Sequence, residues 1–423
     1  MEPNKLYVVL GLQWGDEGKG KVVDVLTPAY RIVARFQGGP NAGHSLVFGG
    51  KTFVLHTIPS GIFRDGTLNV IGNGVVIDPV ILMEEVRQIR PMGIDVASKL
   101  VISKRAHLIL PTHRMLDAAS ESAMGKAKIG STLKGIGPTY ADKTGRNGLR
   151  VSDLLAPDFT ARYAALKQRH LALLAGYAPL SFDLEQAERE WLHAVDEVKQ
   201  FRLEDTEFLL NQALDEGIPV LAEGAQGSLL DIDFGAYPYV TSSNTLAAGA
   251  CTGLGIAPGR IGSVYGIFKA YCTRVGSGPF PTELFDADGE RLRAVGHEFG
   301  ATTGRPRRTG WLDLPALKYS VMMNGVTDLI LMKSDVLDGF DAIKVAVGYR
   351  KDGQIRERFS SDCEDAEPVF KTFPGWKTAL GGIRSYEDLP QAFKDFLAFI
   401  EQQTGCPVRI VSVGPDRDAV IRR

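Results

Sequence analysis

The stretch that decides the fold reads Leu6-Tyr-Val-Val-Leu10, then Gly11-Leu-Gln-Trp-Gly15-Asp-Glu-Gly18-Lys-Gly20-Lys21, then Val22-Val-Asp-Val-Leu26. An apolar run, a glycine-rich turn and a second apolar run predict a strand, a loop and a helix in succession. Such a turn points several backbone N–H groups and the positive end of the helix dipole at an anion. Lys19 and Lys21 add charges that suit phosphate. The stretch therefore predicts a phosphate-binding loop.

This loop departs from the usual P-loop at one position. Gly15, Gly20 and Lys21 match most of the pattern, but Val22 stands where Ser or Thr binds Mg²⁺. Another group must then supply the metal ligand. Asp16 is the obvious candidate, as a ligand for Mg²⁺, as a general base, or as both. The alternative is a capped turn with two surface lysines.

The composition excludes several classes of protein. The 423 residues carry 48 Lys+Arg against 50 Asp+Glu, which argues against a protein that coats nucleic acid or an anionic membrane. No apolar stretch reaches about 18 residues, and the N-terminus turns polar too early for a signal peptide. The four cysteines are too widely spaced for a zinc site. We expect a cytoplasmic enzyme with no nucleic-acid or membrane partner.

Short apolar runs alternate with helical periodicity along the chain. Helices are predicted over Asp158–Gly176, over Leu184–Glu216 with a break, and from Leu389 to Ile400. Strands are predicted at Lys5–Leu10, Arg31–Phe36, Asn69–Ile71, Pro219–Leu221, Asp328–Met332 and Arg409–Val413. This alternation predicts an α/β fold with a large central, mostly parallel β-sheet and flanking helices. We expect a single domain over residues 1–423, with a helical insertion around 115–215.

A second glycine-rich loop, Gln37-Gly-Gly-Pro-Asn41-Ala-Gly43-His44, follows the predicted strand Arg31–Phe36. His44 lies among small residues rather than on an apolar face. An imidazole with a pKa near about 6.5 can donate or accept a proton, and Asp16 could lie nearby at the same end of the sheet. A structural histidine is the alternative.

A third motif, Leu329-Ile-Leu-Met332-Lys333-Ser334-Asp335, resembles the guanine-specifying [Asn/Thr]-Lys-x-Asp element of GTP-binding proteins. A carboxylate accepts from guanine N1–H and the exocyclic amine together, and adenine lacks this pair of donors. Met332 replaces the usual polar residue. The motif indicates GTP rather than ATP.

A fourth motif, Gly300-Ala-Thr-Thr-Gly304-Arg305-Pro-Arg307-Arg308, combines hydroxyls with three arginines. Arginine in a mobile loop can clamp carboxylate or phosphate bidentately, although charge runs are also common on solvated surfaces. Two weaker segments are Glu223-Gly-Ala-Gln226-Gly and the donor-rich stretch from Tyr237 to Asn244.

Taken together, Gln13–Lys21 and Gly300–Arg305 resemble the adenylosuccinate synthetase family, and the similarity continues to Arg417. The resemblance implies a fold related to P-loop GTPases and a homodimer. It also implies GTP-dependent ligation of L-aspartate to IMP, giving adenylosuccinate, GDP and phosphate via 6-phosphoryl-IMP. This is the first committed step from IMP to AMP in purine nucleotide biosynthesis. One Mg²⁺ per subunit is implied as well.

The resemblance assigns residues as follows. Asp16 is the catalytic base and His44 the acid, while Asp16 and the carbonyl of Gly43 bind Mg²⁺. The implied GTP-binding residues are Gly15, Glu17, Gly18, Lys19, Gly20, Lys21, Gly43, His44, Ser45, Arg307, Lys333, Ser334, Asp335, Ser412, Val413 and Gly414. The implied IMP-binding residues are Asp16, Lys19, Asn41, Gly43, His44, Thr132, Gln226, Thr241, Arg305 and, reaching the partner subunit's IMP, Arg146. The implied aspartate-binding residues are Ala301, Thr302, Thr303, Arg305 and Arg307.

Three positions depart from the family pattern. Leu133-Lys134 replaces a commoner Gly-Arg, and Pro306 interrupts the arginine run. Pro306 could stiffen the loop of the implied aspartate ligands.

The implied chemistry is coherent by itself. O6 of a 6-oxopurine is a poor leaving group, so N1 must lose its proton, O6 must be phosphorylated, and phosphate then leaves as the amine attacks C6. Two alternatives remain open: a regulatory GTPase that acts as a switch, and an ATP-dependent purine kinase, against which Asp335 argues.

Overall fold

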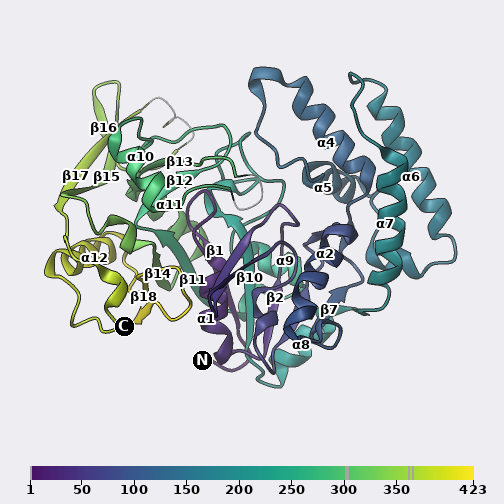
Figure 1. Ribbon diagram of the computed structural model, residues 1–423, viewed down its shortest axis with the longest axis horizontal. Coiled ribbons are helices and arrows are strands. Elements are labelled where there is room, and N and C mark those ends of the chain that lie inside the picture. Colours follow the sequence, from purple (N-terminus) through teal and green to yellow (C-terminus); the bar gives the residue numbers. More distant parts are fainter. Residues whose placement is uncertain (1, 301–303, 361–362, 364–365) are drawn as a thin grey trace.

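The computed structural model describes residues 2–300, 304–360, 363 and 366–423. Its centre is a sheet of ten strands among these residues, and only the edge strand β19 runs antiparallel to its neighbour β18 (Figure 1). In sheet order the strands are β19 (Val420–Arg422), β18 (Val408–Ser412), β14 (Asp328–Met332), β11 (Ile261–Lys269), β1 (Leu6–Gly11), β10 (Val220–Gly227), β2 (Ile32–Arg35), β5 (Leu68–Ile71), β7 (Leu100–Ser103) and β9 (Arg202–Glu204). The predicted α/β class and mostly parallel sheet are confirmed.

Smaller sheets lie beside the central one. A second sheet of five strands in the described part of the chain contains β12 (Tyr271–Arg274), β13 (Arg308–Asp313), β15 (Ala342–Lys351), β16 (Gln354–Arg356) and β17 (Glu367–Pro374). The hairpin of β3 (His44–Phe48) and β4 (Lys51–Leu55) and the short pair of β6 (Val76–Ile77) and β8 (His107–Leu108) are the remaining strands among the described residues. Figure 1 shows the second sheet on the upper left, next to β11 and β14.

Helices flank the central sheet and extend to one side of it. They are α1 (Lys19–Leu26), α2 (Pro79–Ile89), α3 (Val96–Lys99), α4 (Pro111–Ala123), α5 (Ile136–Gly145), α6 (Phe159–Leu174), α7 (Leu184–Val198), α8 (Thr206–Asp215), α9 (Ala248–Leu254), α10 (Ala287–Val295), α11 (Leu314–Asn324) and α12 (Gln391–Thr404). Figure 1 shows α4 to α7 together on the right. The predicted break in Leu184–Glu216 is the edge strand β9, which pairs with β7. No described helix is long and apolar enough to span a bilayer.

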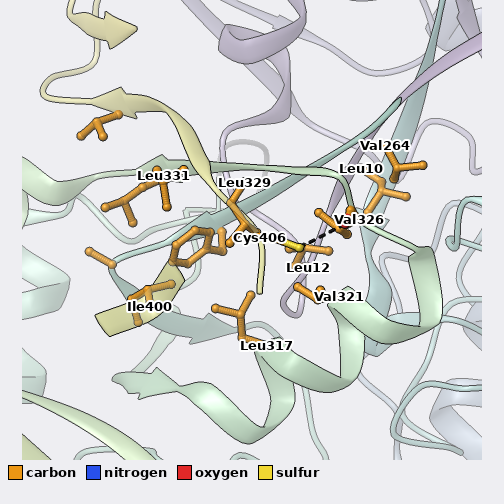
Figure 2. Close-up of a cluster of buried hydrophobic side chains, with 14 of the residues drawn as sticks. Leu10, Leu12, Val264, Leu317, Val321, Val326, Leu329, Leu331, Ile400 and Cys406 are labelled. Carbon is orange, nitrogen blue, oxygen red and sulfur yellow. Dashed lines mark hydrogen bonds between the residues drawn. The ribbon is translucent and has the colours of Figure 1, made fainter. Parts of the chain in front are cut away.

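The central strands are buried on both faces, which explains their continuous apolar sequence. All six residues of β1 are buried. Successive side chains of a strand point to opposite faces, so Leu6, Val8 and Leu10 join one core cluster while Tyr7 and Val9 join another. In Figure 2, Leu10 lies among side chains from β11, β14, α11 and α12, and the thiol of Cys406 donates to the carbonyl of Val326.

One predicted boundary was wrong. We expected a strand at Pro219–Leu221, but β10 runs from Val220 to Gly227. It continues because β1 and β2 pair with it on both sides as far as Glu223, and Gly227 still pairs with Gly11. The polar residues of this segment therefore occupy the end of a central strand. The carboxyl ends of parallel strands are where such sheets bind ligands.

Candidate functional site

The predicted phosphate loop connects β1 to α1 and folds around one buried carboxylate. Glu17 accepts from the backbone N–H of Gln13 at 3.1 Å and of Gly15 at 2.9 Å. It also pairs with Lys19 Nζ at 2.5 Å. A Cβ on Gly11 would lie 2.2 Å from this carboxylate, so only glycine fits there. The Glu17 side chain thus stabilises the loop from inside and occupies the backbone N–H groups of Gln13 and Gly15.

The start of α1 packs against the second predicted loop. Gly18 caps the helix with φ of 92°, a conformation that favours glycine. A Cβ on Gly20 would lie 3.0 Å from Cβ of His44, which opens β3. The helix N-terminus and His44 therefore lie side by side.

Lys21 connects α1 to the segment predicted to bind GTP at the far end of the sequence. Its Nζ donates to Ser412 Oγ at 2.8 Å and to the carbonyl of Gly414 at 2.7 Å. Burial lowers the pKa of Lys21 to about 8. Ser334 Oγ donates to the carbonyl of Ser412 at 2.7 Å, which joins two segments predicted to bind GTP. Burial raises the pKa of the neighbouring Asp335.

His44 is held by a buried carboxylate. Its Nδ1 lies 2.5 Å from Oε1 of Glu223 on β10. The same oxygen accepts from Ser60 Oγ at 2.7 Å, and Glu223 Oε2 accepts from the backbone N–H of Ser60 at 2.8 Å. Burial, with the charge of Arg35 nearby, lowers the pKa of His44 to about 4. The imidazole is therefore neutral near pH 7, and its Nδ1–H donates to the carboxylate.

Several buried polar atoms at this end of the sheet lack a partner. Within the described residues, His44 Nε2, Asn41 Oδ1 and both side-chain polar atoms of Gln226 form no hydrogen bond. An unsatisfied buried polar group costs about 1–3 kcal/mol, so such atoms usually have a water or ligand partner. A Cβ on Gly38 would lie 3.0 Å from Gln226 Oε1, which places Gln226 against the loop that carries Asn41. These residues can accept a polar ligand.

The candidate base pairs with an arginine of the fourth motif. Asp16 Oδ2 lies 2.8 Å from Arg307 Nε, and the Asp16 side chain keeps 32% exposure. The carbonyl of Arg305 accepts from the N–H of Gly300 at 2.8 Å, which closes the loop that precedes Arg307. The candidates Ala301, Thr302 and Thr303 lie outside the described residues. The structure thus places the first and fourth motifs in direct contact.

Other predicted ligands lie farther from this group. Thr132 and Arg146 are exposed, and Arg146 follows α5 with φ of 63°. Among described contacts, neither forms a hydrogen bond with Asp16 or His44. Lys134 Nζ donates to the carbonyl of Pro40 at 2.8 Å, which connects the segment of Thr132 to the loop of Asn41. The backbone N–H of Thr241 donates to the carbonyl of Leu230 at 2.9 Å.

A histidine-rich cluster outside this site resembles a metal centre in composition. Asp142 Oδ2 lies 3.0 Å from His113 Nε2 and 2.8 Å from His170 Nε2. The N–H of Leu110, however, donates to His113 Nδ1 at 2.9 Å. His113 must then carry its proton on Nε2, which cannot also bind a metal ion. The cluster connects α4, α5 and α6.

The chain matches the family model described as adenylosuccinate synthetase over residues 8–421. The chain belongs to this family. It is 59% identical over 420 residues to the adenylosuccinate synthetase of Parabacteroides distasonis, covering 99% of both chains. It is 60% identical over 419 residues to that of Christiangramia forsetii, covering 98% of this chain and 99% of the relative.

Solved structures agree with this family. The structure of fully ligated adenylosuccinate synthetase from Plasmodium falciparum superposes with a TM-score of 0.93 at 37% identity, covering 99% of this chain and 100% of that one. A cyanophage S-2L succinoaminodeoxyadenylate synthetase has a TM-score of 0.63 at 22% identity, covering 100% and 96%, and shares the fold. The family consists of GTP-dependent ligases of purine biosynthesis that require a divalent metal, and ligation of IMP and aspartate is the function that sequence and structure both support.

Several residues of the site were missed or only partly recognised from the sequence. Arg35, Ser60 and Glu298 were not singled out, and Glu223 was noted without its role beside His44. Glu298 stands just before the Gly300 motif, so an acidic residue ahead of three arginines was an available signal. The partnership of Glu223 with Ser60, 163 residues away in the chain, had no local signal.

Proposed function

We propose that the chain forms adenylosuccinate from IMP, L-aspartate and GTP through a 6-phosphoryl-IMP intermediate. The observation that carries this proposal is the placement of Asp16 in the loop that leads into α1, together with the buried His44 packed against the start of α1 at Gly20. A phosphate-binding helix start beside a carboxylate and an imidazole suits phosphoryl transfer coupled to proton transfer.

Asp16 accepts the N1 proton of IMP, which makes O6 nucleophilic. For this step Arg307 must release Asp16, because one carboxylate cannot hold both the guanidinium and the purine N–H in the same place. The freed guanidinium can then stabilise negative charge on the transferring phosphoryl group. His44 Nε2 receives a proton as anionic phosphates approach, since negative charge raises the pKa of an imidazole, and then donates to the phosphate.

The donor set at Asp16 fits a magnesium ion. A partly exposed carboxylate and the carbonyl of Gly43, one residue before His44, are hard oxygen ligands of the kind that Mg²⁺ prefers. We infer that Asp16 and Gly43 hold one Mg²⁺ per subunit. They would replace the Ser or Thr ligand of the usual P-loop, because Val22 occupies that position and cannot bind the ion. When bound, the ion neutralises charge on the phosphates of GTP.

The remaining assignments follow from the motifs. Asn41 and Gln226, whose buried polar atoms await a partner, are proposed to bind IMP. Lys333 to Asp335 and Ser412 to Gly414 are proposed to bind the guanine of GTP, and the loop of residues 300–307 to bind aspartate. The exposed Arg146 is proposed to reach the IMP of a partner subunit in a cytoplasmic homodimer. Residues 1–423 are proposed to form one domain in which residues 115–215 are an insertion.

An assay of phosphate release, with GTP, IMP and aspartate each omitted in turn, tests the proposal. We expect release only when all three are present, and oxygen-18 placed at O6 of IMP is expected in the released phosphate. Release that needs GTP alone would indicate a GTPase switch instead. Phosphate that stays on the purine product would indicate a kinase.

A further inference from the structure

Glu298 is a fully buried carboxylate that the mechanism above does not use. It lies between α10 and the loop of residues 300–307, and its side chain has 0% exposure. Its Oε1 lies 2.9 Å from Lys333 Nζ and 3.3 Å from Lys269 Nζ. Its Oε2 accepts from Arg307 Nη1 at 2.7 Å. One carboxylate therefore holds three cations.

The surroundings of Glu298 fix its charge and its position. Burial alone would raise the pKa of Glu298, but Lys269, Lys333 and Arg307 outweigh it and hold the pKa below the usual value. Tyr271 donates its hydroxyl to Oε1 at 2.5 Å. The backbone of Glu298 accepts from the N–H of Arg307 at 2.9 Å. The carboxylate is thus ionised and rigidly placed.

The two cations on opposite oxygens belong to different parts of the proposed site. Lys333 follows β14 and opens the proposed guanine segment, with φ of 56°. Arg307 directly precedes β13 in the chain and pairs with Asp16 through its Nε. No described carboxylate other than Glu298 contacts both side chains. Guanine recognition and the catalytic base are therefore joined through one buried group.

We propose that Glu298 is a positioning residue that couples occupancy of the guanine segment to the release of Asp16 by Arg307. The inference rests on the proposed function. Glu298 holds Lys333 in place for the nucleotide. It also binds Arg307 through Nη1, so that the guanidinium keeps a carboxylate partner when Asp16 leaves Nε. Without the charge of Glu298, Lys333 keeps only the carbonyl of Gly296, to which its Nζ donates at 2.6 Å, and Asp16 becomes the single carboxylate that contacts Arg307 among the described residues.

The test compares Glu298→Gln with the matched control Glu283→Gln in the full-length protein. Glu283 pairs with Arg308, the residue next to Arg307, with Oε1 at 2.8 Å from Arg308 Nε. The measurements are the Kd for a fluorescent GDP analogue and kcat and KM for each substrate. For Glu298→Gln we expect Kd to rise and kcat to fall, each about tenfold, with KM for IMP changed less than about twofold. Glu283→Gln should leave all three within about twofold.

These quantities separate positioning from a structural role. A merely structural change lowers the active fraction, so apparent kcat falls while Kd and every KM stay at wild-type values, and that result would overturn the proposal. A Glu298→Gln variant that binds and turns over like wild type would overturn it as well. In a double-mutant cycle with Lys333→Ala, the increases in Kd should not multiply, and independent effects would refute the route through Lys333.

A second variant serves if Glu298→Gln does not fold. Tyr271→Phe removes one hydrogen bond to Glu298 and keeps its charge, so we expect a Kd for the GDP analogue about threefold higher. An unchanged Kd would count against the proposal. Weaker GDP binding by Glu298→Gln, together with a wild type that makes no adenylosuccinate, would reject the proposed function and leave the Lys333 contact standing.

Discussion

Replacing Glu223 by glutamine tests how the fold prepares His44. The carboxylate accepts three hydrogen bonds, from His44 Nδ1 and from the backbone and hydroxyl of Ser60, and it lies 4.0 Å from Arg35 Nη1. The amide of glutamine turns at least one acceptor into a donor. The loss of one hydrogen bond to a charged group costs about 1.5–3 kcal/mol. At an effective dielectric constant near 20, loss of the charge opposite Arg35 costs at most about 4 kcal/mol more.

The variant should lose both turnover and stability. Without its acceptor, the His44 ring is free to change tautomer and orientation, and loss of such a partner typically costs about 10–100-fold. We therefore expect kcat for phosphate release to fall by that factor, and denaturant unfolding to show about 3 kcal/mol less stability. The measurements are steady-state kinetics with all three substrates and urea titration at pH 7.

Glu85→Gln is the matched control for this variant. Glu85 is also buried and close to the charge of Arg35, but it binds the backbone N–H groups of His56 and Thr57 instead of His44. We expect kcat of Glu85→Gln to stay within about twofold of wild type. Equal losses of kcat in the two variants would refute the assignment of Glu223 as the partner that orients His44.

Four more predictions use the same assays. Asp16→Asn should abolish phosphate release while the fold, followed by circular dichroism, is kept; retention of more than about 1% of activity would reassign the base. Asp335→Asn should lower the preference for GTP over ATP in kcat/KM at least about tenfold, and an unchanged preference would remove Asp335 from the guanine site. Mixing Arg146→Leu with Asp16→Asn should restore about a quarter of wild-type activity if two subunits share each site, whereas no recovery would indicate self-contained sites. Burial raises the pKa of Glu85 from 4.5 to about 7, so the folded state binds more protons between these values and the free energy of unfolding should fall as pH rises through them. Glu85→Gln should flatten that dependence, and an equal slope in both proteins would contradict it.

Most of the central sheet could be predicted because its strands are apolar runs buried on two faces. β11 could not, although it lies directly beside β1. Gly262, Gly266 and Lys269 interrupt its apolar pattern. A Cβ on Gly266 would lie 2.6 Å from Leu12 Cδ1, and Lys269 is buried because Glu298 pairs with it. Both reasons are tertiary contacts, which a local pattern does not contain.

The candidate site was predictable in its residue types and less so in its contacts. Glycine, lysine and aspartate in one short loop indicate phosphate chemistry because few other roles need that combination. The pairing of Arg307 with Asp16 crosses about 290 residues of sequence and depends on how the loop of residues 300–307 folds back. The same holds for the pairing of Glu223 with His44, 179 residues apart.

The bonds from Lys21 to the last strands bear on how the protein is made. Its Nζ meets Ser412, Gly414 and Ala419, which follow it by 391, 393 and 398 residues. At a synthesis rate of about 5–20 residues per second, this lysine waits roughly 20–80 seconds for its partners to leave the ribosome. Until then the ammonium group of Lys21 lacks the acceptors that it has in the folded protein. The nascent chain therefore cannot complete the proposed nucleotide site early. Competence to bind is acquired at the close of translation, and fragments that stop before Ser412 should be inert.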